Sequence, residues 1–489
     1  MNQKMDARFL RDQGLELFNG NELLVKGALE TEGGVHLLTG YPGSPVATFF
    51  DVLSDIAPLL REHGIEGRIS NNEAISVAAV NGTQMSPLRA MAVVKSVGAH
   101  VASDGLALGN LAGAHPRGGA IVVIGDDPWS ESTQVPTDSR YLCRHLHMPA
   151  VEPATLQEVK DWINLSFRLS QASGFFIGYI ITTTLADGGG AVECRPNHYP
   201  LTNTNQRFEL PTAELKTENT VLLPPRTGRK ELELPERRRK LIEAVRRIGI
   251  NQLEHDGEGA VAIITAGLAY QYVASVLSDW GLADAIPVLK LGMTYPLDDE
   301  QIEAMAESFE HLVVVEERRG FIEEQVAAIV GRAHQRNGGR RRASIWGKEF
   351  PGDVSGFPSA LGLNSSIVAD RLARFLRAID SPLVAQAGGN IVRDLRVIHQ
   401  TAAIDLSIPV RTPTFCPACP HRDSSNVLLE IKSQFTDAAY MRVRHGRGPV
   451  DLLFHGDTGC YTMLMFEPNA PLMHNYSGMG LGGGTGSGI

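Results

Sequence analysis

Short apolar runs of strand length alternate with helical patterns over the first 190 residues of the chain. The runs VHLLTG, RAMAVVK, GGAIVVIG and FFIGYIITTT are almost continuously apolar, whereas segments between them, such as LLVKGALE, place apolar residues at helical spacing. Continuous apolar strands separated by helices are typical of a parallel sheet that is covered on both faces. Residues 1–190 are therefore predicted to form a doubly wound α/β domain.

A second α/β domain is predicted over residues 256–375. The runs AVAIITAG, IPVLKLG and HLVVV indicate strands, and LAYQYVASVLSDW, DDEQIEAMAESF and FIEEQVAAIV indicate helices. This alternation again favours a parallel sheet. Residues 191–255 are rich in proline and charge and predict an extended linker that leads into a charged helix near residues 240–250. Residues 376–410 predict a second linker.

The third part, residues 411–489, is predicted to begin another domain. It contains a helical pattern, SSNVLLEIKSQF, and a strand pattern, DLLF, which leads into GDTGC. The sequence then ends within the glycine run GMGLGGGTGSGI. Because a glycine-rich turn normally leads into a helix that covers the preceding strand, we expect this domain to be incomplete.

Composition narrows the possible functions. The chain of 489 residues has 45 lysines and arginines against 55 aspartates and glutamates, a net charge of −10, which argues against a nucleic-acid partner. No run approaches the roughly 18 apolar residues of a membrane helix, and the N-terminus lacks an apolar signal core. Five cysteines are few for this length, so we expect a reduced, cytoplasmic setting.

The segment CPACPH places Cys416 and Cys419 at CxxC spacing, with His421 two residues further on. A structural zinc site would need a second closely spaced pair of ligands, and Cys460 is the one other cysteine nearby. An iron–sulfur cluster would need four cysteines at close spacing. Both remain less favoured alternatives to a proline-rigidified loop that packs against a cofactor.

The segment GDTGC, which spans Gly456 to Cys460, is a second candidate site. A strand followed by Gly-Asp and a turn of small residues exposes backbone N–H groups that can hold a phosphate. An ordinary turn at the end of a strand is the alternative. The GxGxxG spacing in the final glycine run is a weaker signal, because a dinucleotide site would need an acidic residue about 20 positions later.

Two charged residues in the first domain are also candidates. Glu73 lies within NNEAIS, after two asparagines and at the start of a helical pattern, where the helix dipole alone would favour a carboxylate. Lys95 ends the apolar run AMAVVK, and the carboxyl ends of parallel strands border the ligand crevice. Asp126 and Asp127 end the next strand, where carboxylates can bind a metal or cap a loop.

Seven segments occur together in the order found in one family: GYPGSP, NNEAIS, VVKSVGAHVASD, IGDDPWSESTQVPTDSR, MPAVEPATLQEV, CPACPHR and GDTGC. In this the chain resembles the thiamine-diphosphate-dependent 2-oxoacid:ferredoxin oxidoreductases, most of all the large subunits of indolepyruvate ferredoxin oxidoreductases. The resemblance implies transketolase-like domains: a pyrimidine-binding domain at residues 1–190, a transketolase-C-like domain at 256–375, and the start of a diphosphate-binding domain at 411–489.

The resemblance also implies roles for individual residues. Glu73 would hydrogen-bond the aminopyrimidine of thiamine diphosphate and so promote formation of the thiazolium ylid. Ser44 would bind the carboxylate of the substrate, with Lys95 supplying positive charge nearby. The cofactor would be bound by Tyr41, Pro42, Gly43, Glu73, Cys416, Cys419, His421, Gly456, Asp457, Thr458, Gly459 and Cys460.

The activity that the resemblance implies is oxidative decarboxylation of a 2-oxoacid, such as the aryl 2-oxoacid indolepyruvate, to an acyl-CoA. Electrons would pass through [4Fe-4S] clusters to ferredoxin or another acceptor. The expected Mg²⁺ motif would lie beyond Ile489, and the cluster ligands there or on a second subunit of a dimeric assembly, so no metal ligands are assigned here. A non-oxidative thiamine-dependent decarboxylase and an inactive scaffold subunit are the alternatives.

Overall fold

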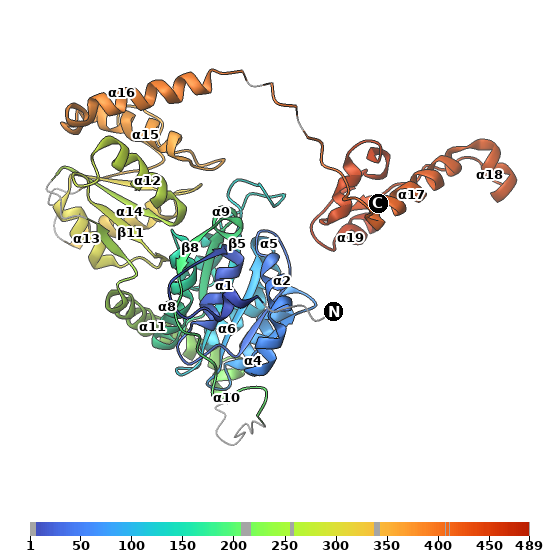
Figure 1. Cartoon of the computed structure of the whole chain (residues 1–489), viewed down its shortest axis with the longest axis horizontal. Helices are drawn as coiled ribbons and strands as arrows, with labels where there is room; N and C mark the ends of the chain where they lie inside the picture. Colours follow the sequence, from blue (N-terminus) through green and yellow to red (C-terminus); the bar gives the residue numbers. More distant parts are fainter. Residues whose placement is uncertain are drawn as a thin grey trace. The chain divides into compact units, whose positions relative to one another are not determined.

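The computed structural model describes residues 6–206, 217–254, 259–336, 343–405, 407–409 and 411–488. The chain divides into two compact units, residues 1–402 and 403–489, which are described separately below (Figure 1). Residues 207–216 and 255 of the expected first linker lie outside the described residues. Among the described residues, no helix is both long enough and apolar enough to span a bilayer.

The larger unit begins with a seven-stranded sheet of order β12-β6-β7-β5-β4-β2-β3. Every neighbouring pair is parallel except β12 with β6. This confirms the parallel sheet predicted from the apolar runs. The strands are β2 Leu37–Gly40, β3 Glu66–Ile69, β4 Arg89–Lys95, β5 Gly119–Asp126, β6 Ala150–Val151, β7 Ile177–Thr182 and β12 Met293–Tyr295.

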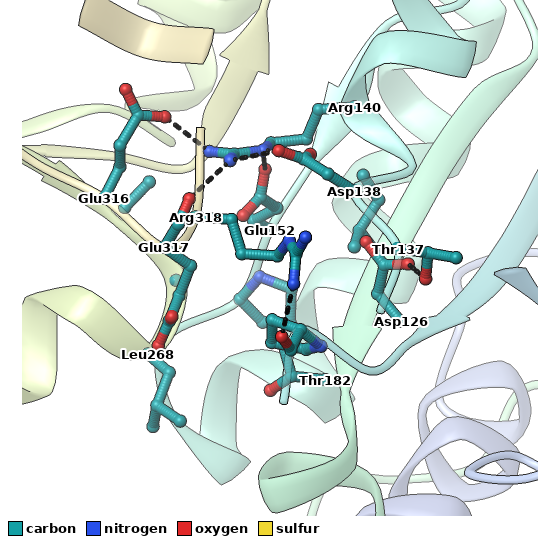
Figure 2. Close-up of a pocket in the computed structure, with 15 residues that line it drawn as sticks. Asp126, Thr137, Asp138, Arg140, Glu152, Thr182, Leu268, Glu316, Glu317 and Arg318 are labelled. Carbon is teal, nitrogen blue, oxygen red and sulfur yellow. Dashed lines mark hydrogen bonds and ion pairs between the residues drawn. The ribbon is translucent and has the colours of Figure 1, made fainter. Parts of the chain in front are cut away.

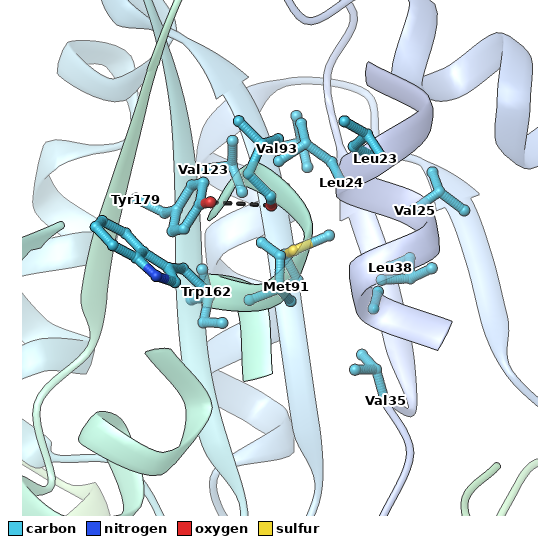
Figure 3. Close-up of a cluster of buried hydrophobic side chains, with 14 of the residues drawn as sticks. Leu23, Leu24, Val25, Val35, Leu38, Met91, Val93, Val123, Trp162 and Tyr179 are labelled. Carbon is cyan, nitrogen blue, oxygen red and sulfur yellow. Dashed lines mark hydrogen bonds between the residues drawn. The ribbon is translucent and has the colours of Figure 1, made fainter. Parts of the chain in front are cut away.

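Two hydrophobic cores cover the two faces of this sheet. Side chains alternate between the cores along each strand: Met91 and Val93 of β4 pack in one core, and Ala92 and Val94 in the other. Figure 3 shows the first core, in which α1 and α8 lie against the strands. The helices of this first core are α1 Gly20–Leu29, α2 Thr48–Asp55, α3 Ala57–Glu62, α8 Leu156–Ser173 and α9 Thr183–Asp187. Those of the second core are α4 Glu73–Thr83, α5 Ser96–Val101, α6 Ser103–Ala112 and α7 Arg140–His145.

A second sheet in the same unit has the order β14-β13-β10-β11-β9, antiparallel only between β11 and β9. Helices again pack on both faces, with α12, α15 and α16 on one side and α13 and α14 on the other. The strands are β9 Gln252–Glu254, β10 Val261–Ala266, β11 Val288–Leu291, β13 His311–Val315 and β14 Ser344–Trp346. The helices are α12 Gly267–Trp280, α13 Asp299–Ser308, α14 Phe321–Arg336, α15 Ser365–Ala378 and α16 Leu383–Ala402.

Two segments expected as linkers contain long packed helices instead. Helix α11 runs from Arg226 to Ile248, well before the expected start near residue 240, and buries Leu241 and Val245 in the first core. Its Arg237 side chain is buried over the Phe175 ring and donates hydrogen bonds to the carbonyls of Asn110 and Gly174. Helix α16 occupies most of the second linker. The expected domain boundaries themselves remain a prediction.

The smaller unit contains the predicted helix α17, Pro420–Thr436, followed by α18, Ala438–His445. The strand expected at DLLF is wrong: the structure has a two-residue strand β15, His455–Gly456, directly after it, paired in parallel with β16, Asn475–Tyr476. The remaining elements of the chain are η1 Ala7–Leu10, β1 Leu15–Asn19, β8 Gly189–Glu193, α10 Thr217–Thr220, η3 Cys460–Met465, η4 Ala470–Leu472 and α19 Gly482–Ser487.

Candidate functional site

The carboxyl edge of the seven-stranded sheet brings together residues that lie far apart in the sequence. The segment GYPGSP follows β2, and the Tyr41 backbone N–H donates a hydrogen bond to the Val93 carbonyl of β4. Gly40 has φ +152°, and a Cβ atom there would lie 1.9 Å from the same carbonyl oxygen, so only glycine fits. The loop therefore starts in direct contact with the end of β4.

Lys95 is the last residue of β4 and crosses this loop. A Cβ atom on Gly43 would lie 2.6 Å from Lys95 Cδ, which shows how closely the lysine side chain passes the turn. Lys95 is 6% exposed. Burial lowers the pKa of its ammonium group, and the carboxylates of Glu73 and Asp127 partly oppose that shift. Ser44 lies in the same turn and is exposed.

Glu73 is the first residue of α4, and the side chain of Asn72 caps this helix by accepting a hydrogen bond from the Ile75 N–H. The Glu73 side chain is 4% exposed, and its Oε1 has no hydrogen-bond partner among the described residues. A Cβ atom on Gly98 would lie 2.5 Å from this oxygen. The structure thus holds a buried carboxylate oxygen without a donor beside a glycine that leaves no room for a side chain.

Asp126 and Asp127, at the end of β5, hold the loop that follows. Asp127 accepts hydrogen bonds from the backbone N–H groups of Glu131, Ser132 and Thr133 at 2.7–3.0 Å. Asp126 is fully buried and accepts bonds from Thr137 and Ser139. Burial raises the pKa of Asp126, whereas the N–H donors lower that of Asp127 despite its own burial. Loop capping, one of the two roles expected for this pair, is what the structure shows.

A buried charge network that the sequence analysis does not predict lies between the two sheets (Figure 2). Arg140 donates to Glu316 Oε2 and to Asp138 Oδ1, both at 2.7 Å, and to the Glu317 carbonyl at 2.8 Å. These residues border a cavity of about 30 Å³. This volume has room for roughly two water molecules and is too small for a cofactor. Burial raises the pKa values of Glu152 and Glu317 to about 7. We assign this network to the joining of the two sheets.

In the smaller unit the two C-terminal motifs lie close together. The His421 ring lies edge-on to the Tyr461 ring, with centroids 6.1 Å apart. Cys419 occupies the N-cap position of α17 without a side-chain hydrogen bond to the helix. Asp457 Oδ2 accepts a bond from the Gly482 N–H, while Oδ1 is buried without a partner among the described residues. Thr458 Oγ1 lies 3.1 Å from the Tyr476 hydroxyl.

The other predicted residues of this unit are more open. Cys416 and Cys460 are exposed, and all five cysteines of the chain are free thiols. Within the described parts of the chain, His, Cys, Asp and Glu side chains do not gather in a group of three or more that could hold a metal. Gly456 lies in β15, and the Gly459 N–H meets Thr462 Oγ1 at 3.3 Å.

A family model described as an indolepyruvate oxidoreductase domain matches residues 253–388. The chain is 29% identical to indolepyruvate oxidoreductase subunit IorA of Archaeoglobus fulgidus, over 92% of this chain and 64% of that protein. It is 27% identical to the IorA subunit of Pyrococcus horikoshii, over 92% and 62%, and 28% identical to that of Methanothermobacter marburgensis, over 96% and 67%. The chain spans less than two thirds of the length of the Archaeoglobus and Pyrococcus relatives.

A solved structure of 2-oxoglutarate:ferredoxin oxidoreductase from Magnetococcus marinus has the same fold, with a TM-score of 0.55 and 15% identity over 74% of this chain and 65% of that one. This likeness and the two mainly parallel sheets confirm the predicted fold class of doubly wound α/β domains. The sequence matches confirm that the chain resembles the IorA subunits of indolepyruvate oxidoreductases, and its fold is that of a 2-oxoglutarate:ferredoxin oxidoreductase.

Proposed function

We propose that this chain binds thiamine diphosphate and catalyses the oxidative decarboxylation of a 2-oxoacid, with indolepyruvate as the first candidate substrate, to an acyl-CoA. One observation carries the proposal: at the carboxyl edge of the sheet, Glu73 keeps a buried carboxylate oxygen that has no donor among the described residues, and its charge acts on the ammonium group of Lys95. Coenzyme A, ferredoxin, a second subunit, [4Fe-4S] clusters, Mg²⁺ and a cytoplasmic setting belong to the same proposal.

The residues present fit the cofactor. A buried acceptor without a donor costs free energy, and an N–H group at a pyrimidine ring would remove that cost at Glu73 Oε1. Because Gly98 has no side chain, this oxygen can lie against its backbone. Tyr41, Pro42 and Gly43 would flank the ring. When bound, thiamine diphosphate supplies the electron sink that decarboxylation of a 2-oxoacid requires.

Each of the chain's own residues then has one task. Glu73 holds a hydrogen bond at the pyrimidine nitrogen through Oε1. The Lys95 ammonium attracts the carboxylate of the 2-oxoacid, and the Ser44 hydroxyl donates a hydrogen bond to it. A buried ammonium binds a carboxylate more strongly than a solvated one does, because its surroundings screen the charge less.

In the smaller unit, we propose that the turn from Gly456 to Cys460 offers backbone N–H groups and the Asp457 carboxylate to the diphosphate and its cation. The free Asp457 Oδ1 supports this role. Cys416, Cys419 and His421 would line the cofactor as part of a rigid loop, which the contact between the His421 and Tyr461 rings supports.

The test is an anaerobic assay of the protein purified with the subunits with which it assembles. With indolepyruvate, coenzyme A and thiamine diphosphate, we expect reduction of methyl viologen and formation of the acyl-CoA, and no reduction when either the 2-oxoacid or coenzyme A is left out. Release of carbon dioxide and an aldehyde in the absence of an electron acceptor would instead indicate a non-oxidative decarboxylase. Failure to bind thiamine diphosphate would indicate a scaffold.

The substitution Gly98→Ala should weaken thiamine diphosphate binding at least tenfold, about 1.4 kcal/mol. The added Cβ would lie 2.5 Å from Glu73 Oε1, so the carboxylate must move from the place where the cofactor would meet it. Isothermal titration with thiamine diphosphate and Mg²⁺ measures the effect. Gly82→Ala is the matched control, since it lies in the same helix as Glu73 and a Cβ there has no atom within 4 Å. Equal affinities of both variants would contradict the assignment of Glu73.

A further inference from the structure

The loop of residues 127–139, between β5 and α7, is attached to both sheets of the larger unit. Near its start, Asp127 accepts three backbone N–H bonds from the loop itself. At its end, Arg140 reaches across to Glu316. Between these points the Pro128 carbonyl accepts a hydrogen bond from Arg318 at 2.8 Å. A loop from the first sheet is thus fixed by residues of the second.

Trp129 also contacts residues of the second sheet. Its indole N–H donates to Glu317 Oε2 at 3.2 Å, and the same oxygen accepts the Leu363 backbone N–H at 3.0 Å. A Cβ atom on Gly362 would lie 1.6 Å from Trp129 Nε1 and 1.8 Å from its Cδ1. The indole therefore lies directly on the Gly362 backbone. We call the site formed by Glu317, Gly362 and Leu363 the Trp129 slot.

The slot lies close in sequence to the candidate site. Asp127 is two residues before Trp129, and in the parallel pairing of β4 with β5 Lys95 lies opposite Gly125, two residues before Asp127. The carboxylates of Asp127 and Glu73 both act on the charge of Lys95. The backbone of Lys95 belongs to the β4–β5 ladder, but its ammonium group makes no hydrogen bond or ion pair with another described residue, so neighbouring charges and packing set its place. Because only two peptide bonds separate the two residues, a shift of Trp129 would also shift Asp127.

We propose that Trp129 is a positioning residue. Seated in its slot on the second sheet, it fixes the Asp127 carboxylate beside Lys95. It thereby sets the position of the Lys95 ammonium group, which receives the carboxylate of the substrate. The inference rests on the proposed function for the identity of that substrate. The second sheet thus takes part in substrate binding by holding one aromatic side chain, although the reacting groups lie at the carboxyl edge of the first sheet.

The chain offers a substitution that empties the slot without touching the candidate site. Gly362→Ala places a methyl group where the indole lies, so the ring must leave. The bonds from Arg318 to Pro128 and from Arg140 to Glu316 remain to hold the loop. Trp129→Phe keeps an aromatic ring in the slot but removes the N–H bond to Glu317 and shortens the ring system. Gly331→Ala in α14 is the control, because a Cβ there meets no atom within 4 Å.

The assembled enzyme is assayed with indolepyruvate and methyl viologen. We expect Gly362→Ala to raise KM for indolepyruvate about tenfold and to change kcat less than threefold, with a smaller rise for Trp129→Phe and none for Gly331→Ala. In a Lys95→Met background, Gly362→Ala should raise KM less than twofold, because the group on which it acts is gone. Equal factors in both backgrounds would mean a purely structural role and would overturn the proposal.

A second measurement separates this inference from the proposed function. If the unsubstituted enzyme turns over no 2-oxoacid, the proposed function fails, and the position of Lys95 is judged by the rate at which acetic anhydride acetylates it, followed by mass spectrometry. Gly362→Ala should change that rate at least threefold relative to Gly331→Ala. An unchanged rate would overturn the proposal whatever the activity of the enzyme.

Discussion

Replacing Glu73 by glutamine should lower the rate of 2-oxoacid-dependent viologen reduction by about 10²–10⁴-fold, the range that a positioned acid–base group contributes. The amide keeps the size and burial of the side chain but lacks the charge that holds a proton at the cofactor's ring nitrogen. The protein should fold as before, because a neutral amide is easier to bury than a carboxylate. Anaerobic assay of the assembled enzyme at saturating thiamine diphosphate measures the loss, and thermal unfolding checks the fold.

Glu66→Gln provides the matched control for this prediction. Glu66 begins β3 of the same sheet and is exposed, so the same chemical change there should leave the rate within twofold. A Glu73→Gln enzyme with the rate of the unsubstituted protein would mean that the buried carboxylate has no part in the reaction. The free Oε1 would then need another explanation.

Much of the candidate site could be predicted because it follows from strand order. Parallel strands end at the same edge of a sheet, so a lysine that ends one apolar run and a loop that follows another must approach each other. Lys95 and Gly43 do so. Glu73 was identified by the family motif, since its helix-start position alone has an ordinary explanation. Its free oxygen is visible only in the structure.

The long helices α11 and α16 could not be predicted from local composition. In α11, charged residues and Pro235 dominate the sequence, and the apolar stripe is short. What stabilises the helix is tertiary packing of Leu241, Ala244 and Val245 against the first core, together with the buried guanidinium of Arg237. Amphipathic helices owe most of their stability to such packing, which a local pattern does not reveal.

The Trp129 slot and the Arg140 network were missed for a related reason. Trp129 and Glu317 are 188 residues apart in the sequence, and Arg140 and Glu316 are 176 apart. The motif DDPWSESTQVPTDSR contains three of these residues, but nothing in it indicates which residues of the second sheet they contact. Only the packing of one sheet against the other brings these charges together.

Replacing Arg140 by methionine should lower the free energy of unfolding of the larger unit by about 3–5 kcal/mol near pH 8, as expected when one partner of a buried ion pair is removed. Arg140 is 5% exposed and Glu316 1% exposed. Without the guanidinium, the carboxylates of Glu316 and Asp138 stay buried without their cation. Urea unfolding followed by circular dichroism measures the difference.

The pH dependence tests the electrostatic origin of this effect. Burial raises the pKa of Glu316 even in the unsubstituted protein, and loss of the cation raises it further. A carboxyl whose pKa is higher in the folded than in the unfolded state favours folding at low pH, and that contribution is lost as the pH rises through the folded value. The deficit of Arg140→Met should therefore shrink from pH 8 towards pH 5, and a second substitution, Glu316→Gln, should recover part of it at pH 8.

Arg144→Met is the control that distinguishes the loss of a buried charge from the loss of an exposed one. Arg144 pairs with Glu324 at 3.3 Å, but the two side chains are 46% and 56% exposed, so its loss should cost less than about 1 kcal/mol at either pH. If both arginine variants lost the same free energy, or if the deficit of Arg140→Met did not change with pH, lost packing rather than buried charge would account for the effect. The two sheets would then be joined mainly by apolar contact, and the high pKa of Glu317, about 7, would have no bearing on their association.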